Sequence, residues 1–290
     1  MGTASDTGRR RLKNEDAFVS LLPLFAIADG MGGARAGEVA SRIATSTLAE
    51  QAGLILDAPT LQQAVRIANT RVFDRATSDP ETLGMGTTVT AALVDEHRGR
   101  ITIGHVGDSR AYRLRGGVLE QLTPDHSLVG ELVREGRLTP EQAESHPHKA
   151  VITRVVGTEA DVEVDTLEAE LQPGDLYLLC SDGLTDMVRD VDIESIVAGF
   201  DGDPQQVANA LVSAANANGG EDNITVIAFE IVDEPAGDRV APTATPAPSR
   251  EDAVPRRRFG AAAGSRWPAL LALAASGGLA ALVVVWSLVR

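Results

Sequence analysis

Residues 24–33 read LFAIADGMGG, an apolar run that stops at Asp29 and continues into a glycine-rich stretch. An apolar run of this length, bounded by turn residues, predicts a buried strand over residues 24–28. The glycines do not form a dinucleotide fingerprint, because Arg35 stands at the third glycine position, and no lysine follows a glycine as a Walker A loop requires. Asp-Gly is also a common turn pair. The role of Asp29 therefore depends on whether other carboxylates follow the same pattern.

Carboxylates do recur at the ends of predicted strands. YLLCSDG places Asp182 after a strand, and ITIGHVGDS places Asp108 after another. Two further acidic pairs, Glu221-Asp222 and Glu15-Asp16, come directly before apolar runs. Strand ends that meet at one edge of a sheet would crowd these charges, and unpaired carboxylates cannot all stay ionised there. An all-oxygen ligand set selects hard cations, so the residues predict bound Mg²⁺ or Mn²⁺.

Charge is divided unevenly along the chain of 290 residues. Residues 1–234 hold 19 lysines and arginines against 38 aspartates and glutamates, a net charge of −19, whereas residues 235–290 hold seven arginines and three acids, a net charge of +4. This acidity argues against nucleic acid as a partner, because nucleic-acid binding depends on neutralising phosphates. The one cysteine, Cys180, lies in an apolar run and is expected to be a buried core residue.

Strands and helices are mixed along residues 18–232, without strict alternation, which favours an α+β fold over a doubly wound sheet. The strands are predicted at 24–28, 87–94, 100–106, 110–115, 162–168, 175–180 and 223–232, with a hairpin about Gly116-Gly117. The helices are predicted at 37–52, 60–77, 127–135, 140–145, 190–198 and 204–217. Thr139 followed by Pro140 is a typical helix start.

The C-terminal part of the chain has a different character. Residues 233–266 are rich in Pro, Ala and Thr and then basic, which indicates a solvated linker. The 22 residues of 268–289 carry no charge, and as a helix they would measure about 33 Å, enough to cross a bilayer. Residues 267–290 therefore predict a transmembrane helix in contact with membrane lipid. The arginines that precede it place the acidic domain in the cytoplasm of a single-pass protein of the cell membrane.

Some residues suit a site but have a simpler explanation. Asp201 and Asp203 precede Pro204 and favour helix capping. His146 and His148 have no cysteine partner and fit no zinc spacing, so a loop contact is favoured, and His105 is expected in the core. Arg11, four residues before Glu15, suits a phosphate, although a surface position in a basic run is an equal alternative.

The motifs RLKNED, ADGMGG, GMGTTVTAAL, VGDSRAYRLR, LTPDHSLV, ITRVVG, PGDLYLLCSDGLTD and EDNITVI follow one another in this sequence. In this order they resemble the PPM family of metal-dependent Ser/Thr protein phosphatases, the type 2C enzymes, in its bacterial branch. The resemblance covers about residues 1–232 and implies two stacked antiparallel sheets with helices outside, an αββα sandwich.

The resemblance also implies roles for single residues. Asp29 would bridge two Mn²⁺ or Mg²⁺ ions, the Gly30 carbonyl would complete one site, and Asp182 and Asp222 would hold the first metal. Together the metals would activate a water that hydrolyses phosphoserine and phosphothreonine on proteins. The remaining implied roles are phosphate binding by Arg11, contacts through metal-bound waters by Glu15 and Asp16, a weaker third metal site with Asp108, and a flap over residues 126–160.

The sequence departs from the family pattern at two positions. Met31 replaces the histidine that is proposed as a general acid in some relatives, and Ala150 replaces a residue that contributes to the third metal site in others. Two other readings stay open: a catalytically dead domain that binds phosphoproteins, and a phosphatase for small metabolites. The expected partners are phosphorylated proteins and, from the resemblance, membrane Ser/Thr kinases that the enzyme would oppose in bacterial signalling.

Overall fold

The computed structural model describes residues 1–200 and 203–232, which fall within one unit, Met1–Gly237. The predicted linker over 233–266 and the predicted membrane helix over 267–290 lie outside the described residues, as does Asp201. Within the described ranges, no helix is both long and apolar enough to cross a membrane.

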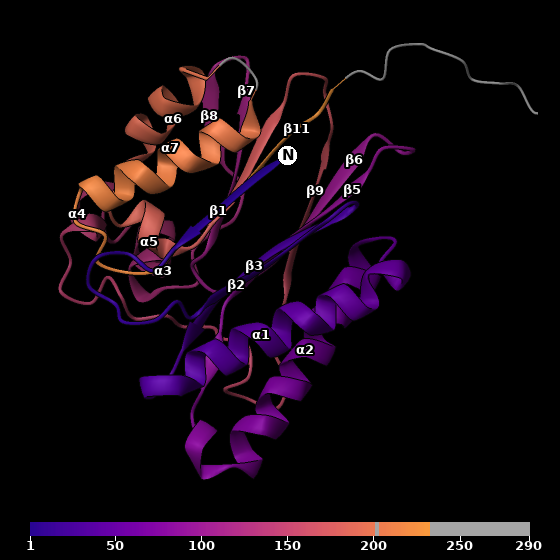
Figure 1. Ribbon diagram of the computed structural model, residues 1–290, viewed down its shortest axis with the longest axis vertical. Helices are drawn as coiled ribbons and strands as arrows, with labels where there is room; N and C mark the ends of the chain where they lie inside the picture. The colour runs from indigo at the N-terminus through magenta and orange to yellow at the C-terminus, as the bar shows by residue number, and fades with distance from the viewer. Residues whose placement is uncertain (201–202, 233–290) are drawn as a thin grey trace, which may run out of the picture. The chain divides into compact units, whose positions relative to one another are not determined.

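The strands pair into two antiparallel sheets that stack on each other (Figure 1). One sheet has the order β1 (Gly2–Asp6), β11 (Ile224–Glu230), β10 (Leu176–Cys180), β7 (Arg110–Arg115) and β8 (Val118–Gln121). The other has the order β2 (Asp16–Leu21), β3 (Leu24–Met31), β5 (Val89–Asp95), β6 (Arg100–Val106) and β9 (Asp165–Glu170), with β4 (Gly86–Thr87) paired to the end of β3.

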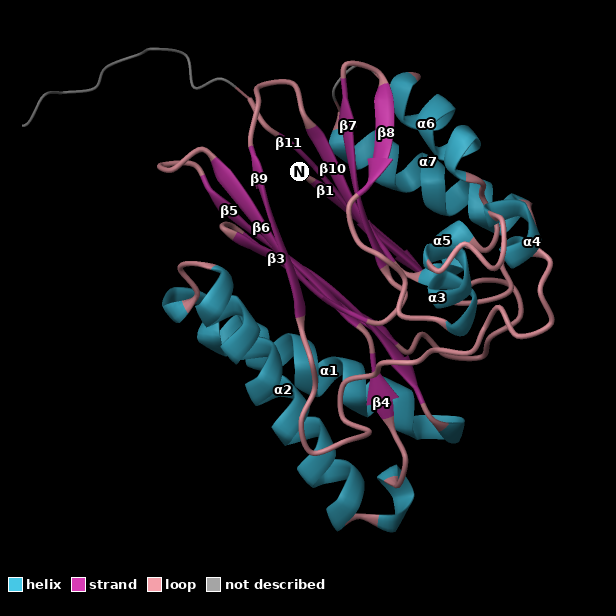
Figure 2. Ribbon diagram, turned by 180° about the vertical axis from the view of Figure 1, so that it is seen from behind, coloured by secondary structure: helices cyan, strands magenta, loops and turns pink. Residues whose placement is uncertain are grey.

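Helices cover the outer faces of both sheets (Figure 2). The helices α1 (Gly33–Gln51) and α2 (Ala58–Ser78), with the 3₁₀ turns η1 (Ala52–Leu54) and η2 (Pro80–Thr82), lie on the sheet that contains β3. The other sheet carries α5 (Asp182–Thr185), α6 (Asp190–Ala198) and α7 (Pro204–Ala217). Between β8 and β9 the chain forms α3 (Leu128–Arg134) and α4 (Pro140–Glu144). The predicted α+β fold of two antiparallel sheets flanked by helices is therefore confirmed.

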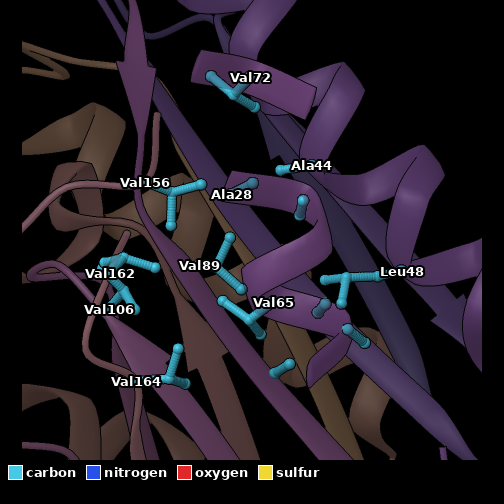
Figure 3. Close-up of a cluster of buried hydrophobic side chains, with 14 of the residues drawn as sticks. Ala28, Ala44, Leu48, Val65, Val72, Val89, Val106, Val156, Val162 and Val164 are labelled. Carbon is cyan, nitrogen blue, oxygen red and sulfur yellow. The ribbon is translucent and has the colours of Figure 1, made fainter. Parts of the chain in front are cut away.

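Alternation along the strands builds three apolar layers. In β3, Leu24, Ala26 and Ala28 face α1 and α2 in the outer core shown in Figure 3, whereas Phe25 and Ile27 face the opposite sheet. The Phe25 ring stacks on Phe229 of β11 with centroids 4.4 Å apart. Successive strand residues point to opposite faces, so Asp29, two positions beyond Ile27, continues the row that faces the layer between the sheets.

Some local predictions differ from the structure. Asp29 was expected at a strand end, but β3 continues to Met31 because Gly30 and Met31 pair with Thr87 and Gly86 of β4. The strands β1 and β2 were not predicted, since GTASD and DAFVSL have weak apolar alternation. They form because Gly2–Asp6 pairs with the free edge of β11, and Asp16–Leu21 pairs with the free edge of β3.

Candidate active site

The candidate site is the polar end of the layer between the two sheets. The same alternation that places Ile27 and Asp29 in this layer also brings Ser181, which follows β10, and Thr225 of β11 to it. Asp16 of β2 lies directly opposite Asp29 of β3 in the strand register. The apolar middle of the layer and its acidic end are thus parts of one continuous pattern.

Asp16 connects the two sheets. Its Oδ2 accepts hydrogen bonds from Ser181 Oγ at 2.8 Å and Thr225 Oγ1 at 2.7 Å. Its Oδ1 is buried without a hydrogen-bond partner among the described residues. Burial raises the pKa of Asp16 to about 6, against the effect of the two hydroxyl donors. One oxygen is therefore fixed, while the other remains available to a cation.

The carboxylates around Asp16 crowd one another. Burial, followed by the charges of Asp16 and Asp182, raises the pKa of Asp29 well above its ordinary value. Burial, followed by the charges of Asp108 and Asp222, does the same for Asp182. The Asp108 carboxyl has a pKa of about 7, mainly because it is buried. Negative charge is therefore costly here unless a cation compensates for it.

Backbone groups hold Asp29 in place. Its N–H donates to Thr88 Oγ1 at 2.9 Å, and its carbonyl accepts from Thr88 N and Thr87 Oγ1, each at 2.8 Å. Thr88 Oγ1 also lies 2.7 Å from Ser109 Oγ, next to Asp108. The strand that carries Asp29 is thereby tied to the loop that carries Asp108.

Asn223 fixes the N-terminal loop against the site. Its Nδ2 donates to the carbonyls of Thr7 at 2.9 Å and Lys13 at 2.8 Å, and its Oδ1 accepts from Glu15 N at 2.7 Å. This loop carries Arg11, whose Nη2 lies 2.5 Å from Asp222 Oδ2. Asn223, Ser181 and Thr225 were not predicted as site residues. Asn223 and Ser181 stand beside an acidic residue in EDN and CSDG, which does not distinguish positioning groups from turn residues, and Thr225 carries no such local signal.

Two glycines are required by close packing. A Cβ atom on Gly30 would lie 2.1 Å from the Gly37 carbonyl oxygen and 2.7 Å from that of Glu15. On Gly183 it would lie 2.1 Å from the Asn223 carbonyl oxygen. The glycine after each aspartate thus lets α1 and β11 approach the acidic end of the layer, a reason additional to the predicted metal contact of Gly30.

The site opens into a cleft of about 760 Å³. Six of the predicted residues line it: Arg11, Glu15, Asp29, Gly30, Asp182 and Asp222. Asp16 and Asp108 are not in its lining, but they act on it through their charges on Asp29. Met31, Ala150 and Ile152 also border the cleft. Ala150 and Ile152 come from the predicted flap, whose base is held by a bridge between Ser127 and Ile152.

The donor set fits a hard, hydrated cation. Buried carboxylate oxygens without partners among the described residues belong to Asp16, Asp108 and Asp182, as expected of ligands to such an ion. In the same residues, no three acidic, histidine or cysteine side chains form a ready metal cage. Mg²⁺ does not need one, because it keeps several waters and usually takes one or two protein carboxylates. The site therefore suits Mg²⁺ or Mn²⁺ held partly through water.

The simpler explanations hold for the remaining candidates. Cys180 is fully buried, and burial raises the pKa of its thiol to about 12, so it is a core residue and no nucleophile. His105 is buried as expected. Asp203 caps α7 by accepting from Gln205 N and Gln206 N. His146 Nδ1 accepts from His148 N in an exposed loop, which confirms the predicted local contact.

Comparisons with known proteins find similar sequences over most of this chain. A family model described as Protein phosphatase 2C matches residues 8–215. The serine/threonine phosphatase stp of Listeria innocua is 41% identical over 238 residues, which cover 78% of this chain and 93% of that protein. PstP, a serine/threonine protein phosphatase of Mycobacterium tuberculosis, is 42% identical over 235 residues, or 79% of this chain and 44% of PstP.

A solved structure also matches this chain over most of its length. The crystal structure of the catalytic domain of PstP in complex with two manganese ions matches with a TM-score of 0.72 and 39% identity. The match covers 80% of this chain and 97% of that one.

Proposed function

The chain belongs to the protein phosphatase 2C family, and we propose that it hydrolyses phosphoserine and phosphothreonine on proteins at a dinuclear Mn²⁺ or Mg²⁺ site. The observation that carries the proposal is the cleft where Asp29, Asp182 and Asp222 lie together with Arg11. Two divalent cations in such a site supply an activated water for in-line attack and offset the charge of the phosphoryl group.

The residues of the cleft have different roles. Asp29, the Gly30 carbonyl, Asp182 and Asp222 hold the two metals, and their position at the end of the layer between the sheets supports this role. Asp16 and Glu15 act through water, which suits Asp16 because Ser181 and Thr225 occupy one of its two oxygens. Asp108 serves a weaker third site, where the side chain of Ala150 offers no ligand atom.

Arg11 binds the substrate phosphate. Its side chain is half exposed and pairs with Asp222 at the edge of the cleft. A phosphate can take two hydrogen bonds from the planar guanidinium, whereas the pairing of Arg11 with Asp222 uses one. When a phosphate binds Arg11, it takes the place of the Asp222 carboxylate, which is itself needed for metal binding.

The decisive experiment compares phosphopeptides with sugar phosphates in Mn²⁺. We expect Mn²⁺-dependent release of phosphate from phosphoserine and phosphothreonine peptides and loss of release in EDTA. Asp29→Asn serves as the inactive control. Turnover of sugar phosphates alone would assign the site to small metabolites, and binding of phosphopeptides without any turnover would indicate a catalytically dead domain.

The proposal includes the C-terminal part of the chain, where it is supported by sequence alone. Residues 267–290 anchor the protein in the cell membrane, with the catalytic domain in the cytoplasm, and phosphorylated membrane Ser/Thr kinases are among its substrates. We expect the full chain to sediment with membranes and a chain that ends at Val232 to remain in the supernatant. If protease added to intact cells cleaved residues 1–232, the proposed orientation would be wrong.

A further inference from the structure

The loop of residues 9–13, here called the basic loop, has a fixed backbone and exposed side chains. The N–H groups of Arg9 and Arg10 both donate to the Gly220 carbonyl, at 2.6 and 3.2 Å, and Asn223 holds the Lys13 carbonyl at 2.8 Å. Arg10 and Lys13 are nevertheless exposed, and the Leu12 side chain between them is fully exposed. The loop therefore presents its side chains outward from a fixed position.

Two cations of the basic loop form no ion pair with a described residue, although the charge of Lys13 acts on the nearby Glu15 carboxyl and opposes the rise in its pKa. Among the arginines and lysines whose side chains the structure describes, Arg10, Lys13 and Arg66 make no ion pair or side-chain hydrogen bond. Arg9 and Arg11 of the same loop pair with Asp6 and Asp222. Residues 1–234 contain twice as many acidic as basic residues, 38 against 19, so a cation outside any ion pair is unusual among the described residues. Of these three residues, Arg10 and Lys13 line the active-site cleft and Arg66 lies on α2.

The position of these cations relative to Arg11 indicates a ligand. Four acidic residues line the cleft and would repel an acidic substrate. Positive charge beside Arg11 offsets this repulsion, so an acidic substrate gains from it. An extended peptide advances about 3.3 Å per residue, so an acidic side chain up to three residues from a phosphorylated one lies within about 10 Å of the phosphate. Arg10 and Lys13 flank Arg11 in sequence and border the same cleft, and their long side chains can reach over this range.

We propose that Arg10 and Lys13 select phosphopeptides that carry aspartate or glutamate close to the phosphorylated residue. The inference rests on the proposed function, in which Arg11 receives the phosphate. Arg10 and Lys13 bind the flanking carboxylates and do not take part in the chemistry. Each exposed ion pair changes kcat/KM by about 1.5- to 5-fold, and the preference weakens as added salt screens the charges.

The test uses the full chain with Mn²⁺ and two phosphothreonine peptides that differ only in acidic or glutamine flanks. We expect a higher kcat/KM for the acidic peptide, by about 1.5- to 25-fold if one or two pairs form. The double variant Arg10→Gln, Lys13→Gln should lose this preference through a higher KM for the acidic peptide. Arg66→Gln, which removes an unpaired cation away from the cleft, is the matched control and should keep the preference.

The outcomes separate this inference from the proposed function. Equal kcat/KM for the two peptides in the wild type, or a preference that survives the double variant, would overturn the selection by Arg10 and Lys13. An equal loss for both peptides would also overturn it, because the residues would then act on the phosphate or on the fold. If neither peptide were dephosphorylated, the proposed function would be contradicted instead.

Discussion

Replacement of Gly30 by alanine tests whether close packing of β3 against α1 positions the site. The added Cβ would lie 2.1 Å from the Gly37 carbonyl oxygen, whereas ordinary contact begins at 3.4 Å, so the backbones must separate by 3.4 − 2.1 = 1.3 Å. Neither neighbour is a flexible side chain, because the nearest atoms belong to the backbone of Gly37 and Glu15. Overpacking of this kind costs about 1–3 kcal/mol.

We expect Gly30→Ala to lower the free energy of unfolding by about 1–3 kcal/mol in urea titrations. The shift also moves the strand that carries Asp29, and a displacement of about 1 Å at a catalytic site can cost about 100-fold in rate. kcat on p-nitrophenyl phosphate should therefore fall more steeply than stability. Gly53→Ala is the matched control, because a Cβ on Gly53 meets nothing within 4 Å. Wild-type stability and kcat in Gly30→Ala would refute the packing argument.

Three further predictions concern metal, phosphate and pH. Mn²⁺ should raise the melting temperature of the wild type in proportion to the logarithm of its concentration, and Asp29→Asn should lose most of this shift; an unchanged shift would exclude Asp29 as a ligand. Arg11→Ala should raise KM for phosphopeptides more than it lowers kcat, and an unchanged KM would contradict its contact with phosphate. His105 is buried against His126, near Asp125 and Asp165, and burial lowers its pKa from 6.5 to about 4. As the pH falls, His105 takes up a proton in the unfolded chain before it does so in the folded chain. The free energy of unfolding should therefore be greatest above pH 6.5 and fall toward pH 4. Between pH 7 and pH 5 the loss is about 2 kcal/mol, and urea titrations of His105→Gln should show a smaller difference.

Local sequence determined the elements whose signals lie within a few residues. β6 and β7 have the predicted bounds because large apolar residues recur at every second position, Ile101 and Ile103 in β6 and Tyr112 and Leu114 in β7. α6 and α7 also match the prediction, and α7 begins where Asp203 caps it and Pro204 occupies its first turn. Capping and side-chain periodicity act over one or two turns, so a single sequence carries enough information to place such elements.

The tertiary structure decided which residues meet. Asp16 faces Asp29 only because β2 pairs with β3 in this register, and a slip of one residue would turn its carboxylate to the opposite face. Thr225 reaches Asp16 across 209 positions of sequence, and Arg11 reaches Asp222 across 211. The order of the motifs assigned the acidic residues to the pattern of one family. The role of each residue stays a prediction. The groups that hold them, Ser181, Thr225 and Asn223, follow from sheet stacking and register, which no local pattern encodes.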